Sequence, residues 1–199
     1  MKLYGSLTSP YVRKLRACAI EQGIDIEFIA EGPSDPAGNV ARLNPLGKVP
    51  VLERDDGEAL FDSPLIVEYL DSVGKTQLIP PVGEARWQAQ RWHALSQGVL
   101  DAVVTRLMET RRAPEKQDSA VIAKQEGKVA AALRYADKQY RGGEYLLGEA
   151  LTIADIAWAV ALEYIDLRYA HDWRTAHPRL AAWHSTIRDR ASLRETRPQ

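Results

Sequence analysis

Short apolar runs alternate with helical patterns over the first 80 residues of the chain. "KLYG" at residues 2–5 is typical of a strand, and apolar positions recur at helical spacing through residues 10–22 until Gly23 ends the run. "DIEFIA" alternates apolar and charged residues, as a half-buried strand does. A short helix ending at Leu43 precedes "VPVLE" and "EALFD", whose intervening turn "RDDG" indicates a β-hairpin, and "SPLIVEYLDS" begins another helix. The order β-α-β-α-β-β-α predicts a small mixed sheet with helices packed on it.

From Glu84 onward, apolar positions recur at helical spacing almost throughout. We expect long helices over residues 85–112 and 118–140 and a final helix over 177–190. The run from Ile153 to Leu162 is apolar on nearly every face, which predicts the buried centre of a helical domain. The segment "VGKTQLIPPVGE", rich in Gly and Pro, separates the two patterns. The sequence therefore predicts an α/β domain at residues 1–78, a linker at 79–83 and an all-helical domain at 84–199.

The composition argues against several classes of protein. Apolar residues make up 45% and charged residues 27% of the chain, as in an ordinary soluble globular protein, and no apolar run reaches the roughly 18 residues that a membrane span needs. A net charge of −1 gives no reason to expect nucleic acid, and the four histidines show no metal-binding spacing. Cys18 is the only cysteine and we expect it in the core, so no internal disulfide can form. Together with the lack of a signal-peptide pattern, this favours a cytoplasmic protein without a metal.

The stretch "GSLTSPYVRK" places Thr8 and Ser9 directly before Pro10 at a strand-to-helix turn. A hydroxyl followed by proline is an ordinary helix start, but the free N–H groups and the dipole of a helix N-terminus also favour an anion. The first 80 residues carry 8 basic and 12 acidic side chains, so an anion there must be bound by local donors and not by a broad positive field.

Two further segments have both a structural and a functional interpretation. "NPLGKVPVL" places Val49–Pro50 just before a strand, where a cis peptide bond would leave the Val49 backbone free to pair with an extended peptide. An ordinary loop proline fits equally well. "FDSP" begins another helix, where Ser63 could bind a carboxylate and Asp62 an amine, although a plain helix cap also fits.

Taken together, "TSPYVRK", "NPLGKVPVL", "FDSPLIVEYL" and "LLGEALTIADI" resemble the glutathione S-transferase family, and the resemblance covers the whole chain. It implies an α/β plus all-α fold, in which a thioredoxin-like domain is followed by a helical bundle domain. It also implies that Pro50 is the family's cis-proline and that Thr152 and Asp155, a capping-box pattern, are structural. The glutathione-binding residues implied by the resemblance are Ser9, Lys48, Val49, Pro50, Asp62 and Ser63.

The resemblance also points to a catalytic hydroxyl at the start of the first helix. Serine-type family members carry it two residues before the proline, which is Thr8, and cysteine-type members carry their thiol one residue before, which is Ser9. We expect Ser9 to be catalytic, with Thr8 as the alternative. A thiol with a pKa near 8.5 would lose about one to two pKa units beside such a donor and a helix N-terminus. Since neither position is a cysteine, disulfide exchange is disfavoured.

Weaker expectations concern the second substrate and the assembly. Tyr11, Arg106 and Arg112 are candidates for an electrophile pocket, and Asp101 for a cleft or a dimer contact, although each also fits a packing or solvated position. The expected protein is a homodimeric, glutathione-dependent transferase that acts on a small electrophile. The alternatives are a non-catalytic or regulatory binding module on the same fold, or a glutathione-dependent isomerase, dehalogenase or peroxidase.

Overall fold

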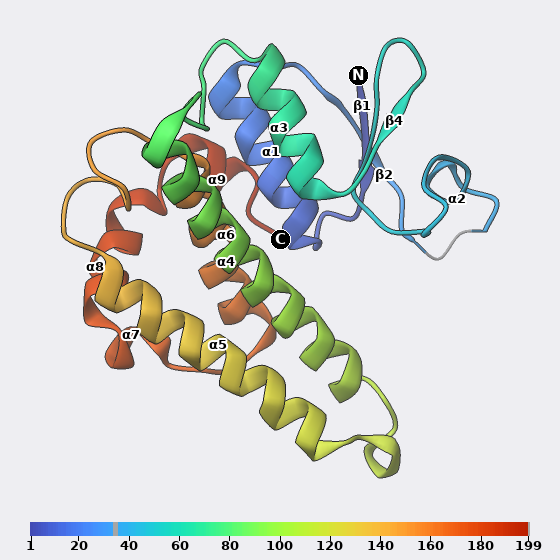
Figure 1. Ribbon diagram of the computed structural model, residues 1–199. Coiled ribbons are helices and arrows are strands. Elements are labelled where there is room, and N and C mark those ends of the chain that lie inside the picture. The colour runs from blue at the N-terminus through green and yellow to red at the C-terminus, as the bar shows by residue number, and fades with distance from the viewer. Residues whose placement is uncertain (34–35, 199) are drawn as a thin grey trace. The chain divides into compact units, whose positions relative to one another are not determined.

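The computed structural model describes residues 1–33 and 36–198. The chain divides into two compact units, shown in Figure 1. The first unit contains Met1–Ile79 together with the residues from Ala191 onward, and the second contains Pro80–Arg190. The chain therefore passes from the first unit to the second between Ile79 and Pro80, and it returns to the first unit at Ala191.

The first unit is built on a four-stranded mixed sheet with the strand order β2-β1-β3-β4. Its strands are β1 (Lys2–Gly5), β2 (Glu27–Ala30), β3 (Val51–Glu53) and β4 (Ala59–Leu60). β1 pairs in parallel with β2 and antiparallel with β3, and β3 pairs antiparallel with β4. β2 begins at Glu27 and not at Asp25 because its ladder starts opposite Lys2, the first residue of the short strand β1.

The helices described in the part of this unit that precedes Ile79 are α1 (Pro10–Gln22), α2 (Asn39–Leu43) and α3 (Ser63–Val73). Figure 1 shows α1 and α3 side by side along one face of the sheet, with α2 on the other side. Val12 and Leu15 of α1 and Leu70 of α3 are fully buried. Gly5 permits the close approach of α1 to β1, since a Cβ at that position would lie 2.3 Å from the side chain of Val12.

The second unit is helical, as the sequence predicts. It contains α4 (Gly83–Thr110), α5 (Ser119–Gln139), α6 (Ile153–Arg168), α7 (Trp173–Ala176), α8 (Pro178–Ile187) and a 3₁₀ turn at Pro114–Lys116. α4 packs against both α5 and α6, and α6 is completely buried from Ile153 to Leu162. The Trp158 indole N–H donates a hydrogen bond to the carbonyl of Trp92 at 3.0 Å, and the two rings meet edge to face. None of the helices described is long and apolar enough to cross a bilayer.

The final helix differs from the expectation. The pattern predicts one helix over residues 177–190, but α8 ends at Ile187 and a turn closed by a bond from Arg190 N–H to the Ile187 carbonyl follows. A separate short helix, α9 (Ala191–Glu195), then packs with the first unit. The periodicity missed this break because residues 188–190 are all charged and therefore fit the exposed side of a continuing helix as well as a turn.

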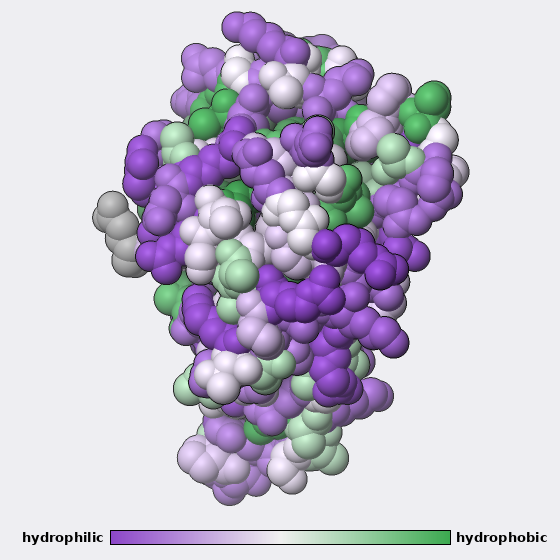
Figure 2. Space-filling view, turned by 90° about the vertical axis from the view of Figure 1, so that its left-hand side faces the viewer, coloured by the Kyte–Doolittle hydropathy of each residue, from purple (hydrophilic) through white to green (hydrophobic). Residues whose placement is uncertain are grey.

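The face of the molecule in Figure 2 is mainly hydrophilic, with hydrophobic side chains scattered among polar ones. Single exposed apolar residues are normal on a globular protein. That face therefore marks no site by its hydropathy.

Candidate functional site

The register of the sheet brings the three N-terminal motifs to one edge of the sheet, the end at which β1 and β4 finish and β3 begins. Tyr4, near the end of β1, pairs with Val51, the first residue of β3, so Val49–Pro50 lies beside the turn that leads from β1 into α1. Leu60, the last residue of β4, pairs with Leu52 of β3. Since β4 runs antiparallel to β3, the start of α3 reaches the same edge. The candidate hydroxyls, the proline segment and the "FDSP" segment are therefore neighbours, although up to 55 residues separate them in the sequence.

Ser9 is the N-cap residue of α1. Its Oγ accepts a hydrogen bond from Val12 N–H at a long 3.4 Å, and its carbonyl accepts one from Arg13 N–H at 3.0 Å. An oxygen that accepts at a cap keeps its own proton for donation. The first turn of α1 contains no acidic residue, so nothing there opposes an anion at this helix N-terminus. Thr8 is exposed, and its hydroxyl lies 3.1 Å from that of Ser6.

The segment before β3 is organised by Asn44, a residue that the sequence interpretation did not single out. Its Nδ2 donates to the Lys48 carbonyl at 2.8 Å and its Oδ1 accepts from Leu46 N–H at 3.0 Å, while the side chain is only 2% exposed. The Val49–Pro50 bond that follows is cis, as the family resemblance implies. Lys48 is exposed. The sequence contained a signal for the role of Asn44, because an asparagine at the start of a turn typically accepts a hydrogen bond from the backbone two residues later.

The start of α3 contains a polar group that the surrounding protein does not satisfy. Ser63 is 1% exposed, and its Oγ has no hydrogen-bond partner among the described residues. Asp62, the N-cap residue, is exposed and its side chain makes no capping bond. A buried polar group without a partner costs about 1–3 kcal/mol. A ligand bound at the same edge of the sheet would supply the missing hydrogen-bond partner and so explain why this hydroxyl is buried.

The weaker candidates occupy both units. Tyr11 lies partly buried in the first turn of α1, whereas Asp101 is exposed on α4. Arg106, also on α4, donates to Glu126 at 2.7 Å and lies over the ring of Tyr169. Arg112 donates to Glu109 at 2.8 Å. Both guanidinium groups thus have carboxylate partners within the helical unit.

Cys18 has the environment of a core residue. It is fully buried in α1, and burial raises the pKa of its thiol to about 12. The thiol therefore stays protonated at neutral pH and is a poor nucleophile. Within residues 1–33 and 36–198, no group of three or more His, Cys, Asp or Glu side chains has an arrangement that could hold a metal ion.

Comparison with known proteins matches both units to one family. The family model described as "Glutathione S-transferase, N-terminal domain" matches residues 3–73, and that described as "Glutathione S-transferase, C-terminal domain" matches residues 119–185. Among curated proteins, the uncharacterized GST-like protein YibF of Escherichia coli strain K12 is 34% identical over 100% of this chain and 98% of its own length.

Solved structures agree. A glutathione S-transferase from Methylobacillus flagellatus KT, crystallised with glutathione bound, is 44% identical with a TM-score of 0.95, covering 100% of this chain and 99% of that one. A glutathione transferase family member from Pseudomonas fluorescens Pf-5, also with bound glutathione, is 37% identical with a TM-score of 0.88, covering 100% of this chain and 98% of that one.

Proposed function

This chain belongs to the glutathione S-transferase family and has the expected thioredoxin-like plus helical fold, and from that premise we propose that it is a glutathione-dependent transferase. In this proposal the enzyme holds the glutathione thiol as a thiolate, which attacks a small electrophile. We propose further that it acts in the cytoplasm as a homodimer. The observation that carries the proposal is the meeting of Ser9, the cis Val49–Pro50 segment and the unsatisfied Ser63 hydroxyl at one edge of the sheet.

Glutathione is an extended tripeptide with two carboxylates, one amine and one thiol, and the donors at this edge are of matching kinds. Ser63 would bind the γ-glutamyl carboxylate through its hydroxyl and the helix N-terminus, and Asp62 would bind the amine. The backbone of Val49, two residues before β3 begins, would pair with the cysteinyl residue in β fashion, beside Pro50. Lys48 would meet the glycine carboxylate. The relatives that are 44% and 37% identical contain bound glutathione, which supports this assignment.

The chemistry requires one shift in ionisation. A free thiol with a pKa near 8.5 is only a few per cent ionised at neutral pH. Ser9 would donate its hydroxyl proton to the sulfur, and the N-terminus of α1 would add its partial positive charge. A hydrogen bond to a charged acceptor contributes about 1.5–3 kcal/mol, which corresponds to about one to two pKa units. The thiol proton would leave to solvent, and the sulfur would form a bond to the electrophile as the leaving group departs with its electron pair. We retain Tyr11 as the candidate for contacting that electrophile.

Glutathione titration by calorimetry, combined with conjugation of a model aryl halide, tests the proposal. We expect saturable binding together with conjugation that depends on the enzyme concentration. Binding without conjugation of any electrophile would favour the non-catalytic module. No binding at millimolar glutathione would overturn the proposal.

Replacing Ser63 by Ala should weaken glutathione binding about tenfold, equivalent to about 1.4 kcal/mol, while leaving the stability of the ligand-free protein unchanged or higher. The reason is that the Ser63 hydroxyl has no hydrogen-bond partner among the described residues, so its bond would form only when a ligand supplies the partner. Calorimetry and thermal unfolding measure the two quantities. Ser72→Ala is the matched control on α3, since Ser72 is exposed and its hydroxyl donates to the Tyr69 carbonyl of the same helix at 2.7 Å. Destabilisation by Ser63→Ala with unchanged affinity would contradict the assignment.

A further inference from the structure

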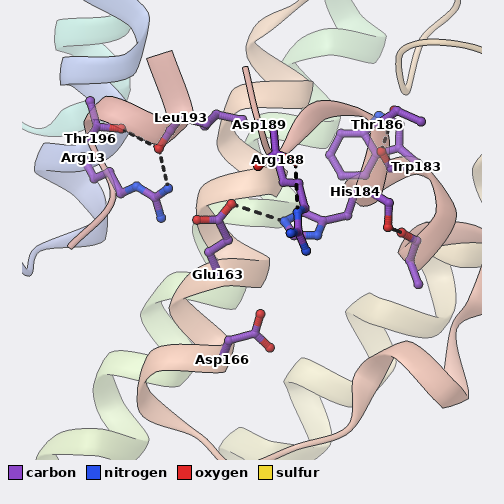
Figure 3. Close-up of polar contacts among 12 residues, drawn as sticks. Arg13, Glu163, Asp166, Trp183, His184, Thr186, Arg188, Asp189, Leu193 and Thr196 are labelled. Carbon is purple, nitrogen blue, oxygen red and sulfur yellow. Dashed lines mark hydrogen bonds and ion pairs between the residues drawn. The ribbon is translucent and has the colours of Figure 1, made fainter. Parts of the chain in front are cut away.

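The short C-terminal helix α9 packs against α1, the helix that begins at the candidate catalytic hydroxyl. The Arg13 guanidinium donates from Nη2 to the carbonyl of Leu193 at 3.0 Å, across 180 positions of sequence. Figure 3 shows Arg13 extending toward that carbonyl, which also accepts a long bond from the Thr196 hydroxyl at 3.4 Å. At the other end of α1, Glu21 accepts a hydrogen bond from the Ser192 hydroxyl.

These contacts lie in a buried environment. Arg13 is 3% exposed, and Ser192, Leu193 and Thr196 are each at most 1% exposed. Arg13, Ala17 and Glu21 are spaced four residues apart, so they form one stripe along α1, with the small buried Ala17 between the two long side chains. Since hydrogen bonds to or from charged groups are stronger than those between neutral groups, this stripe anchors α1 along a face distinct from the one that Val12 and Leu15 present to the core.

Arg13 belongs to the same turn as Ser9, because its backbone N–H donates to the Ser9 carbonyl. The side-chain cap from Ser9 to Val12 is long, at 3.4 Å, so the local cap holds this turn only weakly. We propose that Arg13 is a positioning residue, which uses the Leu193 carbonyl of α9 as an anchor to hold the first turn of α1 where Ser9 and the free N–H groups face the glutathione sulfur. This inference rests on the proposed function for the identity of the ligand. The anchoring of the first turn of α1 by Arg13 does not depend on which ligand binds.

The test compares the pKa of the bound glutathione thiol in five proteins, the wild type and four variants. The ultraviolet absorbance of the thiolate, measured as pH is varied, gives this pKa. In Arg13→Ala we expect this pKa to rise by about one unit, with a kcat about three- to eightfold lower at neutral pH and a smaller change in the KM for glutathione. Arg13→Lys keeps the positive charge and one donor group in place of the planar guanidinium, and it should recover part of the shift. Arg16→Ala is the matched control, because Arg16 lies on the same helix but over the ring of Phe28 at 5.0 Å.

Ser192→Ala separates positioning from general stabilisation. It removes the bond to Glu21 at the far end of α1, so it should lower stability slightly and leave the thiol pKa unchanged. If Arg13→Ala and Ser192→Ala shift the thiol pKa equally, or if neither does, α9 stabilises the fold without positioning the turn, and the inference is wrong.

Amide hydrogen exchange in the ligand-free protein gives a readout that needs no glutathione. In Arg13→Ala the amides of Val12 and Arg13 should exchange about tenfold faster, while amides in the last turn of α1 keep their protection. Uniform loss of protection along α1 would overturn the inference. If the wild-type protein shows no thiolate signal but the local exchange effect is present, the proposed function fails and the positioning of the turn stands.

Discussion

Replacing Ser9 by Ala is expected to lower the rate of glutathione conjugation at neutral pH about 8- to 25-fold, because a rise of one to two units in the thiol pKa, back to about 8.5, lowers the thiolate fraction by that factor. In the proposed mechanism the Ser9 hydroxyl is the donor at the N-terminus of α1, and the first turn of that helix contains no acidic side chain that would repel the thiolate. In the variant, the thiolate would form only as pH approaches the ordinary thiol pKa near 8.5. The activities of the two proteins should therefore converge at alkaline pH and differ most below it.

Steady-state kinetics across pH, with parallel titration of the bound thiol, measures this effect. Ser9→Thr keeps a hydroxyl and should retain much of the activity. Thr8→Val should leave the thiol pKa unchanged, since the Thr8 hydroxyl is exposed and pairs with Ser6. The opposite result, with Thr8→Val inactive and Ser9→Ala active, would transfer the catalytic role to Thr8. Unchanged activity in both variants would rule out a hydroxyl at this turn as the activating group.

Replacing Asp155 by Ala is expected to lower the free energy of unfolding of the helical unit by about 2–5 kcal/mol. The Asp155 carboxylate is completely buried and accepts hydrogen bonds from Leu146 N–H at 2.7 Å and Thr152 N–H at 2.9 Å. It also accepts one from the Thr152 hydroxyl at 3.0 Å. Alanine would leave two buried backbone donors without a partner, and each such donor costs about 1–3 kcal/mol. The variant would thus lose the hydrogen bonds that join the loop before α6 to the first turn of that helix.

Urea unfolding followed by circular dichroism measures the loss. Asp155→Asn keeps one acceptor oxygen and should fall between the wild-type protein and Asp155→Ala. Glu149→Ala is the surface control, because Glu149 is exposed in the loop before α6. A loss below about 1 kcal/mol for Asp155→Ala would show that water replaces the carboxylate at this position.

The sequence alone determined the features that depend on neighbouring residues. The alternation of "DIEFIA", the apolar run of α6 and the Thr152–Asp155 capping pattern each express a relation within a few positions, so the elements, the bond between those two residues and the two-part architecture could be predicted. The four motifs identified the family for the same reason. Each is a short, ordered string of residues that bends or caps the backbone locally.

Only the tertiary structure decided which of these local features meet. The register of β1, β3 and β4 brought the hydroxyl turn, the cis-proline segment and the start of α3 to one edge of the sheet. Burial left the Ser63 hydroxyl without a hydrogen-bond partner in the part of the chain that the structure describes. The buried Asn44 side chain holds the proline segment through its bond to the Lys48 carbonyl. The periodicity of the sequence could not predict the contact between α9 and Arg13, because a bond across 180 residues depends on where α8 ends and how the chain then packs. Pairing and burial over such separations are properties of the folded chain as a whole, and no short window of sequence encodes them.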